Sequence, residues 1–266
     1  MKAILFDLDG VLYQGNEAIP GALQTLHWVR ERDIPHCFVT NTTSKPRSDI
    51  VKKLARMGIT ATADRIISPP RAAAHWLRTH SRGPVALFVP EATRVEFADL
   101  LQWDENIHES VSAVVVGDLG TEWSFARLNQ AFTCLMQDPR PVLIALGMTR
   151  YWKAPGGLQL DTGPFVAALE YATGLAPRVF GKPAATFFQV AADSLGLDVG
   201  ELLMIGDDIH GDVEGAQEAG LRAVLVKTGK FRPEDLQSNV RPDAVLESVA
   251  ELPAWWEKEV QGQAGR

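Results

Sequence analysis

Residues 3–12 read A-I-L-F-D-L-D-G-V-L. The apolar residues 3–6 predict a short buried strand, and Asp7 and Asp9 follow it directly. In an open α/β sheet, ligands bind in the crevice at the carboxyl ends of the strands. Two carboxylates this close are costly unless a cation lies between them, and an all-oxygen ligand set suits Mg²⁺. We therefore predict a magnesium site at this strand end. The alternative is a solvated turn that carries two acidic residues.

Further short apolar runs occur along the whole chain, and stretches with helical spacing separate them. Runs that are apolar throughout are typical of strands covered on both faces of a sheet. The alternation of strand and helix signals predicts an α/β fold with a parallel sheet and right-handed crossovers. The runs are Cys37–Val39, Val85–Val89, Ala113–Val116, Val142–Ala145, Leu202–Ile205 and Ala223–Val226.

The length of 266 residues is sufficient for two domains. The groups that could carry chemistry fall on either side of residues 83–177, so we predict that these residues form an inserted α/β unit. Within it we expect one long irregular loop, Gly147–Gly163, and such loops are usually functional or disordered. Tyr151 and Trp152 of this loop are candidates for substrate choice. Packing inside the inserted unit is an equal alternative for both.

Polar residues follow two other apolar runs. Thr40 and Asn41 come after the run that ends at Val39, and both can donate hydrogen bonds to phosphoryl oxygens. Taken alone, such a cluster is more often a helix cap. Lys182 lies in the segment F-G-K-P at residues 180–183, and its compact positive charge can neutralise a phosphate oxygen or a carboxylate. Lys182 is a functional candidate only because the other motifs occur in the same chain.

A third group of carboxylates follows the apolar run that ends at Ile205. We interpret Asp207 as a metal ligand, and Asp208 or Asp212 as a residue that tunes the site from behind it. An acidic helix start is the alternative for the last two. The similar Gly117-Asp118 pair lacks a second Asp and falls inside the inserted unit, so we interpret it as ordinary strand-end chemistry.

Composition limits the partners and the compartment. The formal net charge of −7 and the absence of a basic run argue against a nucleic-acid partner. No stretch approaches the roughly 20 apolar residues of a membrane span, and Met1 and Lys2 lead directly into a strand-like run, so we expect neither a membrane segment nor a signal peptide. The two cysteines make a disulfide framework improbable. We expect a cytoplasmic protein.

Taken together, the segments DLDGVL, VTNTT, FGKP and IGDDIHGD resemble, in this order, the four motifs of the haloacid dehalogenase superfamily. The insert resembles the type 2 cap of its NagD-like phosphatases. The likeness covers most of the chain and extends to the segments RYWK at 150–153 and VKTGK at 226–230. It implies a Rossmann-like parallel-sheet core, residues 1–82 and 178–266, with an α/β cap formed by residues 83–177.

The resemblance also implies a role for each motif residue. Asp7 would be the nucleophile and a ligand of Mg²⁺, and Asp9 would be the general acid/base and would offer its backbone carbonyl to the metal. Thr40, Asn41 and Lys182 would hold the phosphoryl group, and Asp207 would be the third protein ligand. The second Asp of the first motif favours a phosphatase over a dehalogenase.

Two other classes of function stay open at the level of sequence. A phospho-accepting receiver module also gathers Asp, Thr and Lys around Mg²⁺, but it is about half as long and has no cap. A catalytically silent binding protein is the second alternative, although all of the catalytic positions are intact. The sequence predicts a small phosphorylated metabolite as the substrate without identifying it, and it leaves open a homodimer formed through the cap.

Overall fold

A computed structural model describes residues 1–104, 106, 110–154 and 156–264. The chain forms two compact units, which we describe separately. The first unit contains Met1–Thr40, Ser48–Ile67 and the chain from Lys182 onward. The second unit contains Asn41–Arg47 and Ser68–Gly181. The predicted cap limits, residues 83 and 177, stay a prediction. The two compact units are defined by how closely their residues pack, and such a division need not coincide with the boundaries of an inserted domain.

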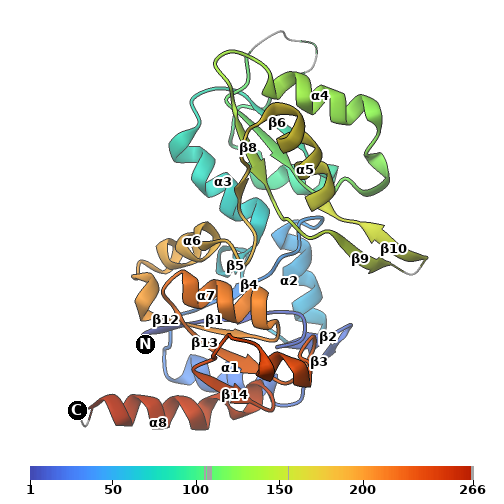
Figure 1. Cartoon of the computed structure of the whole chain (residues 1–266). Coiled ribbons are helices and arrows are strands. Elements are labelled where there is room, and N and C mark those ends of the chain that lie inside the picture. Colours follow the sequence, from blue (N-terminus) through green and yellow to red (C-terminus); the bar gives the residue numbers. More distant parts are fainter. Residues whose placement is uncertain (105, 107–109, 155, 265–266) are drawn as a thin grey trace. The chain divides into compact units, whose positions relative to one another are not determined.

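The first unit is built on a six-stranded sheet with the order β14-β13-β12-β1-β4-β5 (Figure 1). All of its neighbouring strands are parallel, which confirms the predicted α/β class. Four of the strands contain predicted apolar runs, whereas β5 and β14 were not predicted. The strands are β1 (Ala3–Asp7), β4 (His36–Val39), β5 (Ile66–Ile67), β12 (Leu202–Gly206), β13 (Arg222–Val226) and β14 (Ala244–Leu246).

Helices cover both faces of this sheet. Ile4 and Phe6 belong to a hydrophobic core that they share with side chains of α1, α2 and α8. Because alternate residues of a strand point to opposite faces, Cys37 faces the other side, where its Sγ lies 3.7 Å from Ser194 Oγ of α6. The helices are α1 (Ala22–Glu31), α2 (Arg47–Arg56), α6 (Ala185–Leu195), α7 (Gly215–Glu218) and α8 (Leu252–Ala264). Burial on both faces explains why these strands are apolar throughout.

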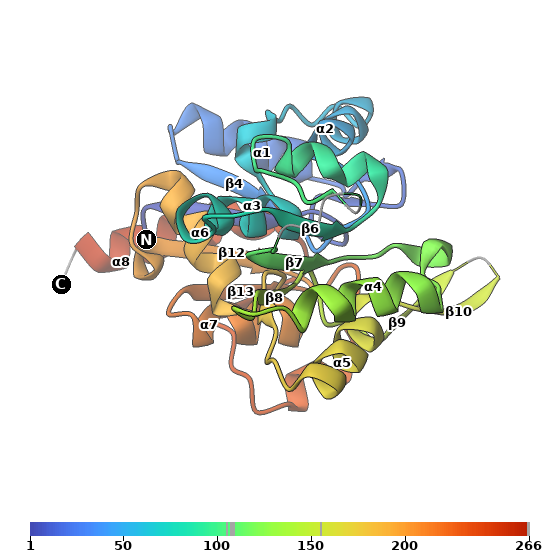
Figure 2. The ribbon, with the colours of Figure 1, turned by 90° about the horizontal axis from the view of Figure 1, so that it is seen from above.

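The second unit has its own four-stranded parallel sheet, with the order β11-β8-β7-β6. Figure 2 shows α4 and α5 together on one face of this sheet and α3 on the other. The core between the sheet and α4 and α5 includes Phe88, Val114 and Leu169. The elements are α3 (Pro69–His80), β6 (Val85–Phe88), β7 (Ala113–Val116), α4 (Phe125–Leu135), β8 (Val142–Ala145), α5 (Thr162–Thr173) and β11 (Arg178–Val179).

The expectation of an irregular loop at Gly147–Gly163 is wrong. This segment contains an antiparallel hairpin of β9 (Tyr151–Ala154) and β10 (Gly157–Leu160), and α5 then begins at Thr162. The side chains of Tyr151 and Trp152 are 57% and 43% exposed, so neither packs in the core of its unit. The pattern was missed because β10 is exposed at each of its positions and therefore lacks the alternation of a half-buried strand.

Short elements complete the described chain. A small hairpin of β2 (Tyr13–Gln14) and β3 (Glu17–Ala18) follows β1. Short 3-10 helices, with η5 a π-helix, also occur: η1 (Ala63–Arg65), η2 (Glu91–Phe97), η3 (Gly120–Glu122), η4 (Val199–Glu201), η5 (Ile209–Glu214), η6 (Pro233–Gln237) and η7 (Val249–Glu251). Among the described residues, no helix combines the length and the apolar character that a membrane crossing requires.

Candidate active site

Three buried carboxylates meet at the carboxyl ends of two neighbouring strands of the first unit. Asp7 is the last residue of β1, and Asp207 directly follows β12, which is paired with β1. Asp212 reaches the same place from η5. One carboxylate oxygen from each of the three lies within 4.8 Å of the others. This is the carboxyl-end position at which parallel α/β sheets bind their ligands.

Lys182 lies between two of these carboxylates. Its Nζ is 2.6 Å from Asp7 Oδ1 and 2.5 Å from Asp212 Oδ1, and its side chain is only 5% exposed. Burial disfavours the charged ammonium, but the negative charges of Asp212 and Asp7 outweigh this effect and raise the pKa of Lys182. The lysine therefore stays charged at neutral pH and fixes the direction of the Asp7 carboxylate.

One lysine does not balance three carboxylates in a buried site. Burial, together with the charges of Asp212 and Asp207, raises the pKa of Asp7 to about 7, although Lys182 opposes the change. Burial likewise raises the pKa of Asp207 to about 6, against the donation from the Lys230 N–H. Asp207 Oδ1 is buried without a hydrogen-bond partner among the described residues. A buried carboxylate oxygen without a partner, in a cluster of three carboxylates, fits a Mg²⁺ ion, because Mg²⁺ prefers oxygen ligands.

Two glycines lie directly against the carboxylate of Asp207. Its Oδ2 accepts a hydrogen bond from Lys230 N at 2.6 Å and lies against Gly10 and Gly229. A Cβ at either glycine would collide with this oxygen, and both glycines have positive φ, 87° and 65°. Sequence reasoning assigned no role to Gly229. A T-G-K segment just after a buried strand was the available signal.

The structure separates the two acidic residues that the sequence left equivalent. Asp212 Oδ2 accepts hydrogen bonds from the N–H groups of Asp207 and Asp208, while its other oxygen binds Lys182. Asp208 instead caps η5 through the N–H groups of His210 and Gly211. Asp212 thus belongs to the carboxylate cluster, and Asp208 supports the start of the next helical segment.

Of the other predicted residues, Asp9 and Thr40 belong to the first unit, whereas Asn41, Tyr151 and Trp152 belong to the second. Asp9 is exposed in the turn that follows β1, and its backbone pairs with Tyr13. Thr40 is buried and follows β4 by one residue, and since Val39 is paired with Asp7, Thr40 lies at the same sheet edge as the nucleophile candidate. Asn41 begins the segment Asn41–Arg47 of the second unit, and the hairpin residues Tyr151 and Trp152 lie within its other segment, Ser68–Gly181.

Asp118 gives a useful contrast within the second unit. It also follows a buried strand, β7, and it is partly buried. Its Oδ1 accepts a hydrogen bond from Gly120 N at 3.0 Å, which closes a local turn. This is the ordinary strand-end chemistry that the sequence suggested for it.

Comparisons with known proteins agree with this geometry. Residues 4–100 match a family described as haloacid dehalogenase-like hydrolase, and residues 179–252 match one described as HAD-hydrolase-like. The two matched segments include Asp7, Thr40, Asp207 and Asp212. They also include Lys182.

Full-length relatives extend the match across both units. The chain is 37% identical to phospholysine phosphohistidine inorganic pyrophosphate phosphatase of Homo sapiens, over 94% of this chain and 92% of the relative. It is 40% identical to haloacid dehalogenase-like hydrolase domain-containing protein 2 of Bos taurus, over 92% and 91% of the two chains. NagD of E. coli has the same fold, with a TM-score of 0.83 over 94% of this chain and 98% of NagD, at 24% identity. The chain therefore belongs to the haloacid dehalogenase-like hydrolases, as a phosphatase with the fold of NagD.

Proposed function

We propose that the chain is a Mg²⁺-dependent phosphatase that transfers the phosphoryl group of a small substrate to Asp7 and then to water. The observation that carries this proposal is the buried Asp7 carboxylate, 2.6 Å from Lys182 Nζ, in a cluster with Asp207 and Asp212. A nucleophilic carboxylate must point towards phosphorus. Nearby positive charge is needed as well, because the carboxylate and the phosphoryl group are both anions and repel each other as they approach.

Asp7, Asp207 and the backbone carbonyl of Asp9 would hold the metal, and Asp212 supports this set from its bonds to Lys182 and to the amides of residues 207 and 208. When bound, Mg²⁺ would neutralise negative charge on the carboxylates and on the transferring phosphoryl oxygens. Lys182 holds a further positive charge next to the reacting oxygen of Asp7. Thr40 and Asn41 would donate hydrogen bonds to the phosphoryl oxygens.

Asp9 is the candidate acid and base for the two steps. In the first step an oxygen of Asp7 bonds to phosphorus, the bond from phosphorus to the leaving oxygen or nitrogen breaks, and Asp9 gives that atom its proton. In the second step Asp9 takes a proton from water, the water oxygen bonds to phosphorus, and Asp7 is released as a carboxylate. The exposed position of Asp9, two residues from the buried Asp7, favours this exchange of protons.

The substrate class is a small phosphorylated compound. The name of the human relative includes phospholysine, phosphohistidine and inorganic pyrophosphate, and each of these combines a phosphoryl group with a small leaving group. We propose the hairpin β9–β10 as the element that selects among leaving groups, because Tyr151 and Trp152 are exposed on it. A homodimer through the cap and a cytoplasmic location remain predictions from the sequence.

Replacing Asp7 by Asn tests the proposal, because an amide is not a nucleophile towards phosphorus. We expect Asp7→Asn to lose at least about 10³-fold in kcat with p-nitrophenyl phosphate and Mg²⁺ while its melting temperature shows a folded protein. Asp118→Asn is the matched control, since it changes a partly buried strand-end carboxylate outside the cluster, and it should keep its activity. Substantial turnover by Asp7→Asn would contradict the assignment, and an inactive wild-type protein would favour the silent binding protein.

A further inference from the structure

A cavity opens in the first unit, at the end of the sheet opposite to the carboxylate cluster. Its volume is about 400 Å³, and it lies between the end of α1, the start of β4 and residues 60–65. β4 begins in its wall at His36 and ends at Val39, beside Asp7. At about 3.3 Å per residue, the strand places the cavity roughly 10 Å from the candidate active site.

Hydrogen-bond donors line one side of the cavity. Arg30 and Arg65 are both in the lining, and Arg30 Nη2 donates to the backbone oxygen of Thr60 at 3.1 Å, which fixes that guanidinium at the rim. The half-buried residue His36 is also in the lining. Burial lowers the pKa of His36, and the charges of Arg65 and Arg30 lower it further. Two cations therefore act on the same small volume.

Apolar groups form the other side. Phe38, Ile34, Pro35 and Ala61 are all in the lining, so the cavity can take an organic body as well as a charged group. The volume falls in the range of about 300–1,000 Å³ that is usual for small-molecule sites. Asp33 is the one carboxylate among the lining residues, and it adopts a left-handed φ of 49° at the end of α1.

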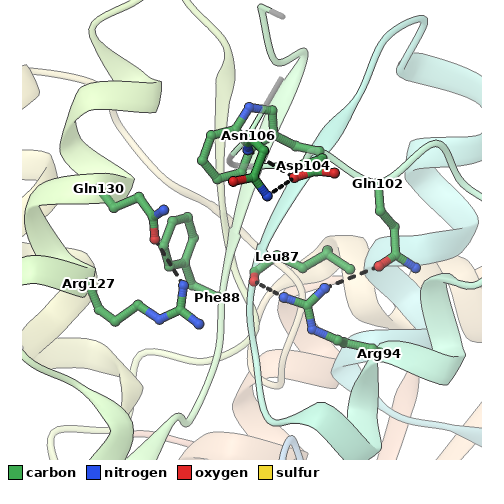
Figure 3. A pocket seen from close by; sticks show the side chains of 9 residues that line it. Leu87, Phe88, Arg94, Gln102, Asp104, Asn106, Arg127 and Gln130 are labelled. Atoms are coloured by element: carbon green, nitrogen blue, oxygen red, sulfur yellow. Dashed lines mark hydrogen bonds between the residues drawn. The ribbon is translucent and has the colours of Figure 1, made fainter. Parts of the chain in front are cut away.

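The polar cavity of the second unit provides a comparison (Figure 3). It has a similar volume, about 390 Å³, and also contains two arginines. There Arg94 donates to Leu87 O and to Gln102, and it forms an ion pair with Glu91 at 3.2 Å. In the cavity of the first unit Arg30 donates to Thr60 O, and the ion pair of Arg65 Nε with Asp64 Oδ2 is longer, at 3.8 Å. Each lining contains one aspartate, so the looser ion pair of Arg65 makes the cavity of the first unit the better candidate for an anion.

We propose that the cavity of the first unit binds a small organic anion, with its phosphate or carboxylate group between Arg30 and Arg65 and its apolar part against Phe38. The cavity shares none of its lining residues with the candidate active site. The proposal therefore stands independently of the phosphatase reaction, and its failure would leave the proposed function intact.

Nuclear magnetic resonance of the His36 ring tests this proposal. Phenylphosphonate and benzoate serve as probes, because each joins an oxyanion to a flat apolar ring and neither is an ester that a phosphatase could hydrolyse. We expect a saturable shift of the His36 signals, and we expect the pKa of His36 to rise on binding because an anion then offsets the charges of Arg30 and Arg65. A response to one probe alone assigns the phosphate or the carboxylate class, and a response to both assigns the shared oxyanion.

Three variants distinguish specific binding in the cavity from a general effect of the charge of the protein on anion binding. Arg65→Gln should weaken binding at least about tenfold, because a charge-assisted hydrogen bond is lost. Asp33→Asn should tighten binding, since it removes a repulsive charge while Asn tolerates the left-handed backbone. Lys52→Gln, which removes an exposed cation of α2 outside the cavity, should leave binding unchanged. The absence of a saturable His36 shift, or an equal loss of binding in Arg65→Gln and Lys52→Gln, would overturn the proposal.

Discussion

At the scale of single residues, the account depends on the close approach of backbone to the Asp207 carboxylate. Gly229 has a φ of 65°, and a Cβ there would collide with Asp207 Oδ2. Gly229→Ala should therefore displace Asp207 and weaken Mg²⁺ binding by about 10–100-fold, as changes behind a metal ligand commonly do. Titration of activity with Mg²⁺ measures this loss as a higher half-saturating concentration.

Gly196→Ala is the matched control for this prediction. Gly196 ends α6 with a nearly equal φ of 67°, but an added Cβ would meet no atom within 4 Å. Both variants carry a backbone strain of about 1 kcal/mol, but Gly229→Ala adds collisions with Asp207 Oδ2 and Gly10 Cα, so its melting temperature should fall further than that of Gly196→Ala. A similar loss of Mg²⁺ affinity in both variants would show that strain, and not the collision with Asp207, is the cause.

At the scale of elements, the hairpin β9–β10 carries two exposed aromatic residues, Tyr151 and Trp152. Trp152 is 43% exposed, so Trp152→Ala should change the melting temperature little, within about 0.5 kcal/mol of stability. We expect it to change the ranking of substrates by kcat/KM and to affect p-nitrophenyl phosphate least, because a small ester has few groups to contact. Tyr171→Ala is the control, since Tyr171 is 94% exposed on α5 outside the hairpin. Equal scaling of every substrate in Trp152→Ala would count against a role in selection.

The elements also differ in how far the sequence could predict them. Strands buried on both faces, such as β1 and β7, are continuous apolar runs and were predicted at nearly their observed bounds. β5 was missed because two residues, Ile66–Ile67, are too short to form a pattern. The hairpin was missed because exposed strands have no buried face to impose alternation.

In the candidate site, too, some residues could be predicted from the sequence and others could not. Carboxylates directly after buried strands were predicted from their position, because a parallel sheet brings those strand ends to one edge. The choice between Asp208 and Asp212 was not predictable, since it depends on which oxygen turns back towards Lys182 and the amides of the preceding residues. The role of Gly229 depends on a contact between segments more than 200 residues apart in the chain, Gly10 and Gly229.

At the scale of the whole molecule, metal binding and folding are linked through the buried carboxylates. The folded pKa values of Asp7 and Asp207, about 7 and about 6, lie above the unfolded value near 4. The metal-free folded state therefore binds more protons than the unfolded state, and its stability should fall as pH rises from about 4 to about 7. Mg²⁺ replaces those protons, so its stabilising effect should grow over the same interval.

Thermal melting in chelator and in excess Mg²⁺ measures this linkage. We expect Mg²⁺ to raise the melting temperature by roughly 5 °C or more near pH 7.5, and by clearly less near pH 5. Asp207→Asn should remove most of the difference at the higher pH. A Mg²⁺ effect that is equal at both pH values would contradict the proposed ligand set.

The central claim is that Asp7 carries the phosphoryl group, and the most direct measurement is to detect it there. Asp9→Asn should accept the phosphoryl group from p-nitrophenyl phosphate but release it slowly, because no base prepares the attacking water. Rapid acid quench followed by mass spectrometry of the peptide that contains residue 7 should find phosphorylated Asp7 in Asp9→Asn, and none in the Asp7→Asn, Asp9→Asn double variant. Slow turnover by Asp9→Asn without phosphorylation of Asp7, or phosphorylation at another residue, would contradict the account.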